Sequence, residues 1–163
     1  MIIGVGTDIL EVSRMERAVS RESFCRRVFT EEERRQAGGR VPFLAGCFAV
    51  KEAVVKCFGT GFIGVKPDEV EALRDSRGRP YVRLYGGALR ICREMGGTGI
   101  HVSISDAGGF VTAFAVMEGT VPAGDAPEME EKDPAGDAPG MEEKVPAGDA
   151  PGAEDEQEGG GRA

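Results

Sequence analysis

The chain begins with an apolar run typical of a buried strand, and apolar side chains then recur at helical spacing. Residues 1–6 (MIIGVG) form a short apolar run, which predicts a buried strand. In residues 11–19, apolar side chains recur at helical spacing at Val12, Met15 and Val19. This second segment therefore predicts an amphipathic helix.

Two further helices are predicted next, and the second is the most apolar element of the sequence. Thr30 stands three residues before Glu33, the spacing of a capping box, so a short polar helix is expected to start there and to stop at residues 38–39 (GG). Residues 43–58 (FLAGCFAVKEAVVKCF) contain no proline and precede the glycine-rich residues 59–61 (GTG). They predict a long, central and largely buried helix.

The next part of the sequence has the pattern of strands joined by tight turns. Residues 69–74 and 80–84 flank the turn sequence DSRGR and predict two paired strands. Residues 86–95 predict a helix, and residues 101–105 and 110–117 predict a hairpin. The predicted class is α+β, with a mainly antiparallel sheet packed on the long central helix.

A change in composition divides the chain of 163 residues near Gly119. From Val121 a 12-residue unit, first VPAGDAPEMEEK, occurs three times, and residues 121–163 hold 13 acidic and 3 basic side chains. We expect residues 120–163 to be a disordered acidic tail beside a folded domain of residues 1–119, because the tail has too few apolar side chains to offset its ordering entropy. The tail either increases solubility without a specific partner or competes with an acidic partner for basic patches.

The folded part is mildly basic, because residues 1–120 hold 17 Lys and Arg against 15 Asp and Glu. The four cysteines lie far apart without a C-x-x-C pair, and a single histidine is present, which argues against a zinc site and for reduced core thiols. No charged leader with an apolar stretch begins the chain, and no apolar run approaches the ~20 residues that span a bilayer. We expect a soluble, cytoplasmic protein with neither membrane nor nucleic acid among its partners.

Two carboxylates, Asp8 after the first predicted strand and Glu52 in the long predicted helix, are candidate site residues. Asp8 follows the predicted first strand, so its side chain is expected at a strand end, although a helix N-cap explains an Asp there equally well. Glu52 and Lys56 interrupt an otherwise apolar helix, where an unpaired buried ion is costly. They are four residues apart and share one helix face, so a simple ion pair is the alternative interpretation.

Two carboxylates from different elements, Asp8 and Glu52, together with Lys56 would suit the binding of a magnesium-bound pyrophosphate. Mg²⁺ prefers oxygen ligands and typically takes one or two carboxylates together with substrate phosphates and water. The lysine would neutralise phosphate charge, and the backbone amides of residues 59–61 follow the same helix. The glycines alone are weak evidence, because a helix end requires glycine in any case.

Three segments resemble, in order and spacing, the signature regions of bacterial holo-acyl-carrier-protein synthases. They are GVGTDILEVSR (residues 4–14), FLAGCFAVKEAVVKCFGTG (residues 43–61) and HVSIS (residues 101–105). The similarity covers about residues 1–118 and leaves the repeats outside it. It implies a compact α+β phosphopantetheinyl transferase, typically a homotrimer that binds coenzyme A (CoA) between subunits. Such an enzyme transfers 4′-phosphopantetheine from CoA to a serine of apo acyl carrier protein, releases 3′,5′-ADP, and supports fatty acid biosynthesis.

The resemblance also assigns roles to individual residues. Asp8 and Glu52 match the family's Mg²⁺ ligands, and together with Lys56 they form the expected catalytic group. The residues expected to contact CoA are Lys56, Gly59, Thr60, Gly61, His101, Ser103 and Ser105. The residues expected to dock the acidic carrier protein are Arg14, Arg17 and Arg21. For His101, a purely structural role at the start of a strand is the alternative.

The sequence departs from the family at two positions. Cys47 stands where many members have arginine, and Asp106 stands where many have histidine, so we expect an altered CoA affinity rather than loss of the reaction. A metal-bound water or a carboxylate such as Glu52 would accept the serine proton, and the sequence does not choose between them. Two other functions stay open: the same chemistry on carrier domains of large synthases, and a non-catalytic trimeric CoA-binding module.

Overall fold

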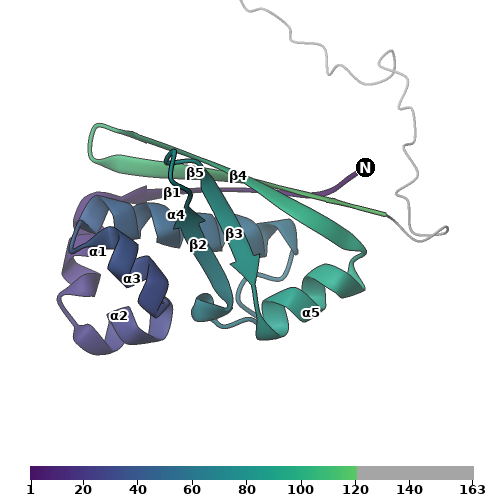
Figure 1. Cartoon of the computed structure of the whole chain (residues 1–163), viewed down its shortest axis with the longest axis horizontal. Coiled ribbons are helices and arrows are strands. Elements are labelled where there is room, and N and C mark those ends of the chain that lie inside the picture. Colours follow the sequence, from purple (N-terminus) through teal and green to yellow (C-terminus); the bar gives the residue numbers. More distant parts are fainter. Residues whose placement is uncertain (121–163) are drawn as a thin grey trace, which may run out of the picture. The chain divides into compact units, whose positions relative to one another are not determined.

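The computed structural model describes residues 1–120, which form two β-sheets and a group of helices (Figure 1). The elements follow in the order β1 (Ile2–Glu11), α1 (Val12–Val19), α2 (Glu22–Val28), α3 (Glu31–Ala37), α4 (Val41–Cys57), η1 (Pro67–Glu69), β2 (Val70–Arg74), β3 (Pro80–Leu84), α5 (Gly86–Glu94), β4 (Gly97–Ala107) and β5 (Phe110–Gly119). The predicted disorder of the acidic repeats concerns residues that lie outside this described part.

Every strand pair in the described residues is antiparallel. β5 is the central strand of a three-stranded sheet with the order β1-β5-β4, and β2 and β3 form a separate two-stranded sheet. In the larger sheet, Asp8 on β1 pairs with Ala113 on β5, and Ser103 on β4 pairs with Phe114 on β5. The predicted α+β class and antiparallel pairing are confirmed, and the strands are divided between two sheets.

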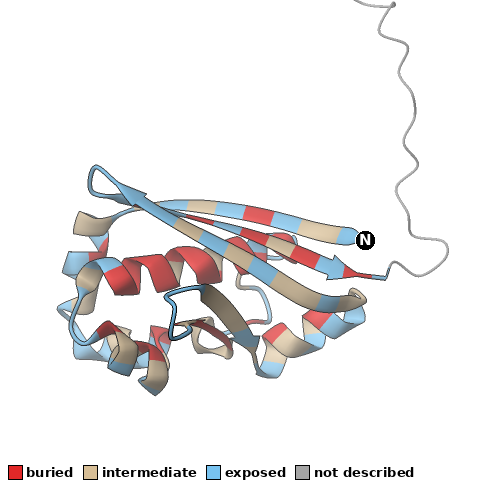
Figure 2. Cartoon of the chain, turned by 45° about the horizontal axis from the view of Figure 1, so that its top comes forward, coloured by how far each residue is buried: buried red, intermediate tan, exposed pale blue. Residues whose placement is uncertain are grey.

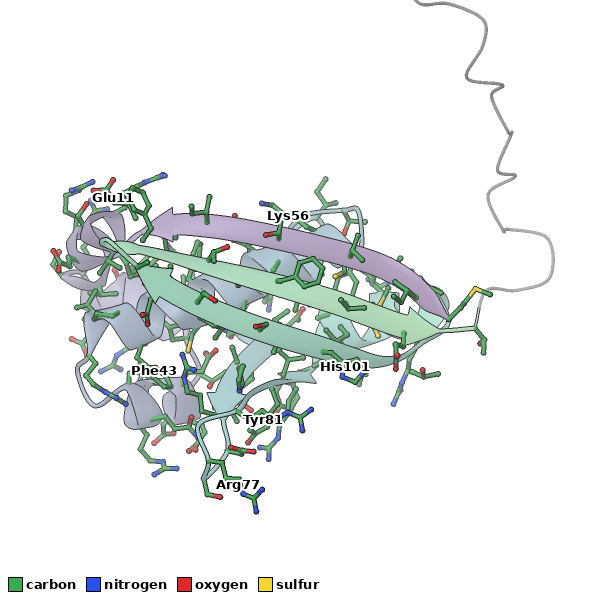
Figure 3. The ribbon with its side chains drawn as sticks, turned by 90° about the horizontal axis from the view of Figure 1, so that it is seen from above. Glu11, Phe43, Lys56, Arg77, Tyr81 and His101 are labelled. Carbon is green, nitrogen blue, oxygen red and sulfur yellow. The ribbon has the colours of Figure 1, made fainter. Side chains whose placement is uncertain are left out.

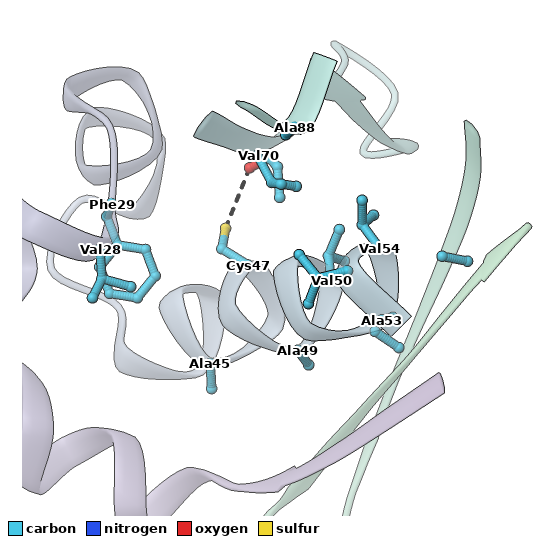
Figure 4. Packing of buried hydrophobic residues seen from close by; sticks show 14 of the residues in the cluster. Val28, Phe29, Ala45, Cys47, Ala49, Val50, Ala53, Val54, Val70 and Ala88 are labelled. Carbon is cyan, nitrogen blue, oxygen red and sulfur yellow. Dashed lines mark hydrogen bonds between the residues drawn. The ribbon is translucent and has the colours of Figure 1, made fainter. Parts of the chain in front are cut away.

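Helix α4 forms the centre of the core beneath the three-stranded sheet, and most of its surface is buried (Figure 2). Its sequence explains this position, because apolar side chains surround the helix axis and the fully buried ones include Ala49, Val50 and Val54. Helix α4 also contacts α1, α3 and β2, in addition to the three-stranded sheet. The core therefore extends from the inner face of the sheet, through α4, to β2 and the smaller helices (Figure 4).

The capping box at the start of α3 and the glycines after α3 and α4 are found where the sequence predicts them. The Thr30 hydroxyl accepts a hydrogen bond from the Glu33 N–H at 3.2 Å, and the Thr30 N–H donates to the Glu33 carboxylate at 2.8 Å, which completes the capping box of α3. α3 is followed by Gly38 at φ 54°, and α4 by Gly59 at φ 72° just beyond its last turn. Both helices thus end at left-handed glycines, as the sequence predicts.

The first strand is longer and more exposed than predicted. β1 continues to Glu11, because its pairing with β5 extends until Glu11 lies opposite Phe110. Along this strand only Gly6 is buried. Asp8 therefore lies within a strand, and its predicted places at a strand end or at a helix N-cap are both wrong.

All four cysteines are free thiols, of which Cys25 is half-buried and the others are buried. Burial raises the pKa of Cys47 to about 12 and that of Cys57 to about 11. The prediction of reduced core thiols is confirmed for Cys47, Cys57 and Cys92. Among the helices of residues 1–120, none has the length and apolar character needed to cross a membrane.

Candidate active site

Strand β1 and the last turn of α4 meet at an ion pair. The Lys56 ammonium donates to Asp8 Oδ1 at 2.9 Å and to the Thr7 carbonyl at 2.8 Å. Asp8 shares the strand alternation of Gly6 and Leu10, so its side chain lies on the face of the sheet that covers α4. The Asp8 side chain is 16% exposed and that of Lys56 is 49% exposed. A partly shielded carboxylate therefore lies against a lysine that solvent can reach.

Glu52 lies one helical turn before Lys56 and is half-buried. Burial raises the pKa of Glu52, the negative charge of Asp8 raises it further, and Lys56 lowers it. The structure thus brings the three predicted residues into one electrostatic group. Within the described residues Lys56 pairs with Asp8, so the simple ion pair between Glu52 and Lys56 is not formed.

The loop after α4 begins directly beside this group. Gly59 and Gly61 both have left-handed backbones, with φ of 72° and 59°, and Thr60 between them is exposed. The Gly59 N–H donates to the Lys56 carbonyl at 3.0 Å, which fixes the start of the loop to the turn that carries the lysine. The predicted phosphate-facing loop is therefore adjacent to the predicted catalytic residues.

The two carboxylates fit an open magnesium site better than a closed metal cage. Among residues 1–120 no group of three or more His, Cys, Asp or Glu side chains is placed to surround an ion. Asp8 and Glu52 supply oxygen ligands from two elements. Burial and, after it, the negative charge of Asp8 raise the pKa of Glu52, so a cation bound by both carboxylates would relieve the repulsion between them. Mg²⁺ commonly binds through one or two carboxylates, with substrate phosphates and water completing its shell.

The predicted residues of β4 lie on the other face of the sheet. His101, Ser103 and Ser105 are exposed, while Val102 and Ile104 between them pack toward the core. His101 Nε2 lies 3.1 Å from Glu118 Oε2 on β5. Viewed from above the sheet, His101 lies at the β4 edge and Lys56 at the β1 edge (Figure 3). One chain alone therefore does not bring the β4 residues to Asp8.

The three arginines predicted for carrier docking do share a surface. Arg14 and Arg17 project from α1 and Arg21 from the start of α2, and all three are exposed. They line a shallow cavity of about 300 Å³ together with Ala18 and Phe24. The three arginines therefore form a positively charged surface that also includes the apolar residues Ala18 and Phe24.

A larger cavity of about 910 Å³ opens beside the start of α4 and the end of β2. Two arginines approach the ring of Phe43 there, with the guanidinium carbons of Arg40 and Arg74 at 5.1 Å and 5.2 Å from its centroid. Asp75 and Asp106 also line this cavity. An aromatic ring with two guanidinium groups suits a planar or anionic ligand, and sequence reasoning did not find this site.

A family model described as the 4′-phosphopantetheinyl transferase superfamily matches residues 4–115, a range that contains every site residue described above. The chain belongs to this superfamily. Among curated relatives, a holo-[acyl-carrier-protein] synthase of Lachnoclostridium phytofermentans is 44% identical over 118 residues, covering 72% of this chain and 97% of the relative. A synthase of the same name from Desulfovibrio desulfuricans is 43% identical over 122 residues, covering 72% of this chain and 98% of the relative.

Solved structures of the superfamily have the same fold. The holo-[acyl-carrier-protein] synthase of Neisseria meningitidis matches with a TM-score of 0.67 and 35% identity, covering 72% of this chain and 99% of that chain. The synthase of Bacillus anthracis, in complex with CoA (3′,5′-ADP), matches with a TM-score of 0.60 and 35% identity, covering 74% of this chain and 99% of that chain. The superfamily match ends before the acidic repeats.

In this phosphopantetheinyl transferase the lysine directly before Glu52 has a different environment from Lys56. The side chains of Lys51 and Glu33 are both 0% exposed, and Lys51 Nζ lies 2.8 Å from Glu33 Oε1. Lys51 thus points toward α3 and β2, whereas Glu52 points toward β1. Sequence reasoning missed this pair, although a lysine in so apolar a helix requires an acidic partner.

Of the two departures from the family pattern, only Asp106 is among the residues that line the large cavity. Cys47 is buried in the core, and its thiol donates to the Ala72 carbonyl at 3.3 Å (Figure 4). Asp106 is exposed at the cavity wall. Arg40 and Arg74 reach the same cavity from the start of α4 and the end of β2. The transferase therefore has positive charge in this region from residues outside the three sequence motifs.

Proposed function

We propose that this chain is a Mg²⁺-dependent holo-acyl-carrier-protein synthase. It transfers 4′-phosphopantetheine from CoA to a serine of apo acyl carrier protein and releases 3′,5′-ADP, in the cytoplasm and in support of fatty acid biosynthesis. The observation that carries the proposal is the meeting of Asp8, Glu52 and Lys56 between β1 and α4. The superfamily match and the CoA complex of the Bacillus anthracis relative support the choice of substrate.

Asp8 and Glu52 are the residues that would hold Mg²⁺, and the bound ion would neutralise charge on the CoA pyrophosphate. Both side chains must be ionised to do so. Lys56 already pairs with Asp8 at 2.9 Å, so a positive charge lies against that carboxylate before any metal ion binds. The substrate end of the site stays open, because the lysine is half exposed and the neighbouring loop is exposed.

Lys56 and the loop of residues 59–61 would bind the phosphates. A lysine ammonium on a flexible stem can turn from Asp8 to a phosphate oxygen without losing a charged partner. Gly59 and Gly61 have no side chains, so the loop backbone can approach a ligand closely at these two positions. These groups act mainly by offsetting negative charge as the serine attacks the β-phosphorus, which is usually the largest contribution in phosphoryl transfer.

We propose the 910 Å³ cavity as the site of the adenosine 3′-phosphate end of CoA. Arg40 and Arg74 offer guanidinium groups for a phosphate, and Phe43 offers an aromatic ring beside them. Asp106 at the wall reduces the positive charge there. An altered CoA affinity, rather than lost turnover, remains our expectation for this chain.

We further propose that the working form is a homotrimer in which neighbouring copies complete each site. His101, Ser103 and Ser105 face away from the Asp8 group, so a CoA molecule that contacts both sets has to lie between copies. The outer face of the three-stranded sheet carries exposed apolar side chains that suit such a contact, at Val5 (57%), Ile9 (68%), Phe110 (48%) and Phe114 (48%).

The arginine surface of α1 and α2 is the proposed docking site of the acyl carrier protein. Arg14, Arg17 and Arg21 are exposed and line one cavity, so an acidic helix can face all three. Charge complementarity of this kind accelerates association more than it strengthens binding. Salt is therefore expected to lower the association rate, with little effect on the chemical step.

The test of the reaction is intact-mass spectrometry of apo acyl carrier protein incubated with the full chain, CoA and Mg²⁺. We expect a mass gain of one phosphopantetheinyl unit, lost with EDTA and with Glu52→Gln, and retained in the exposed control Glu94→Gln. Binding of CoA without any mass gain on several carriers would reject the transferase and favour a CoA-binding module. A gain only on carrier domains of large synthases would correct the partner.

The test of the shared site is complementation between two inactive variants. Glu52→Gln removes the carboxylate on the β1 side, and His101→Ala changes the β4 side. If each site combines the two sides from neighbouring copies, co-refolded mixtures regain part of the transfer activity that the separate variants lack. Recovery should be absent if both sides act within one chain, and light scattering of the wild-type chain should give a trimer mass.

A further inference from the structure

Strand β1 and helix α4 approach each other unusually closely next to the catalytic group. Gly4, Gly6 and Asp8 alternate along β1 and therefore face the helix together. A Cβ at Gly6 would lie 2.0 Å from the Ala53 carbonyl oxygen, and a Cβ at Gly4 would lie 2.6 Å from the Cys57 carbonyl oxygen. Backbone thus meets backbone, and no side chain is available to move aside.

The two helix residues in these contacts are the direct successors of the two predicted site residues. Ala53 follows Glu52, and Cys57 follows Lys56. Each glycine therefore lies against one of the two turns that carry the site residues. The distance between β1 and α4 at these points sets how far Glu52 and Lys56 lie from Asp8.

Conformational freedom does not explain these glycines. Neither has a positive φ, in contrast to ten other glycines of the described residues. Glycine within a strand weakens it, because the chain loses more entropy on folding and no side chain packs. The close backbone contact is the feature that requires the missing Cβ.

We infer that Gly4 and Gly6 are positioning residues for the transfer reaction, which rests on the function proposed above. By omitting their side chains they let α4 come near enough for Glu52 and Lys56 to act with Asp8. An alanine at position 6 would move the Ala53 turn by about 1 Å or more, because a Cβ essentially never lies within 3.0 Å of another heavy atom. A displacement of that size at reacting groups lowers rates by about 100-fold.

The experiment compares three glycine-to-alanine variants of the full chain. Gly6→Ala has the severe contact, Gly4→Ala has the milder one, and Gly46→Ala is the matched control on α4 itself. A Cβ at Gly46 would meet its nearest heavy atom at 3.6 Å, which is ordinary contact. Transfer rates are measured against CoA and Mg²⁺ concentration, and a crystal structure of each stable variant gives the distance from Asp8 Oδ1 to Lys56 Nζ.

We expect kcat/KM to fall by about 100-fold in Gly6→Ala and by a smaller factor in Gly4→Ala, with a higher Mg²⁺ concentration at half-maximal rate. Gly46→Ala should stay within twofold of the wild type. If Gly6→Ala does not fold, Gly4→Ala decides the question. A fall in kcat that only follows the folded fraction, with an unchanged Mg²⁺ dependence, would overturn the inference.

The two proposals can fail separately. If the wild-type chain transfers nothing, the proposed function is wrong, and the crystal structures still decide whether the glycines set the Asp8–Lys56 distance. If the wild type transfers and the distance in Gly6→Ala or Gly4→Ala stays at the 2.9 Å of the wild type, the positioning role is wrong while the function stands. A longer distance together with the rate loss supports both.

Discussion

Replacing Lys51 with methionine removes a charge that is completely buried between three elements. The ammonium bridges Glu33 of α3 at 2.8 Å, the Pro67 carbonyl at 3.0 Å and the Val70 carbonyl. Methionine has nearly the same stem length, so packing changes little and the lost interactions are polar. The variant therefore measures the combined contribution of this ion pair and of the two carbonyl hydrogen bonds to the stability of the fold.

The expected destabilisation is large because the remaining carboxylate cannot reach water. Glu33 keeps hydrogen bonds from the N–H groups of Thr30 and Ala72, both at 2.8 Å, but loses its only buried counter-charge among the described residues. Breaking a buried pair by removing one partner typically lowers the free energy of unfolding by about 3–5 kcal/mol. A small domain has about 5–15 kcal/mol in total, so Lys51→Met should be near the limit of folding at neutral pH.

The penalty has a definite pH dependence. Burial raises the pKa of Glu33 and Lys51 opposes the rise, so the variant has a still higher pKa for this carboxyl in the folded state. A carboxyl with a raised folded-state pKa binds its proton more tightly in the folded protein than in the unfolded chain. The loss caused by Lys51→Met is therefore fully present above the pKa of Glu33 in the folded variant. It shrinks as the pH falls through that pKa toward the less strongly raised pKa of Glu33 in the folded wild type.

The assay is urea unfolding of the wild type and Lys51→Met at pH 7 and pH 5, followed by circular dichroism. Arg26→Met, which breaks an exposed pair with Glu22, is the control and should leave stability unchanged within error. Adding Glu33→Gln to Lys51→Met should recover part of the loss, because the unpaired charge is gone. An equal loss at both pH values, or a loss below about 1 kcal/mol, would refute this account of the buried pair.

Three further predictions concern the site and the tail. Transfer activity should decline on acidification at a pH above the usual pKa of a glutamate, because burial and Asp8 raise the pKa of Glu52; a pH–rate profile with an unshifted acidic limb would contradict this. With a thiol reagent such as DTNB, Cys25 should react before Cys47, whose burial raises its pKa to about 12; native-state labelling followed by peptide mapping checks the order. Truncation after Gly119 should leave urea unfolding unchanged and turnover near normal, and loss of soluble oligomer would show that the tail is structural.

The parts of the fold that depend on local signals could be predicted from the sequence. The capping box at Thr30, the apolar pattern of α4 and the glycine after its last turn each act within a few residues, and all three are confirmed. Helix α2 was not predicted, because its seven residues ESFCRRV are too few to display a helical period. The length of β1 was underestimated because pairing with the distant strand β5, which continues until Glu11 lies opposite Phe110, determines where it ends.

That three of the candidate residues lie together could be predicted from the sequence, but that the candidate residues of β4 lie on the opposite face of the sheet could not. Motif order placed Asp8, Glu52 and Lys56 in one group, and the structure brings them together. Arg40 and Arg74 were not found, since they belong to no motif and meet only where the start of α4 and the end of β2 come together over Phe43. Burial of Lys51 was foreseeable from its apolar surroundings, but the choice among the three glutamates of α3 required the structure.

Strand β1 contributes both to the proposed catalytic site, through its inner face, and to the proposed contact between copies, through its outer face. At its inward positions, Gly4 and Gly6 lie against α4 and Asp8 belongs to the proposed catalytic group. Its outward positions, Val5 and Ile9, form part of the proposed contact between copies. Because successive side chains point to opposite faces, a register slip of one residue against β5 would exchange the two sets. It would bury a valine against the helix and expose the carboxylate on the outer face. Register, rather than the motif alone, therefore determines whether this chain can form the site and the assembly together.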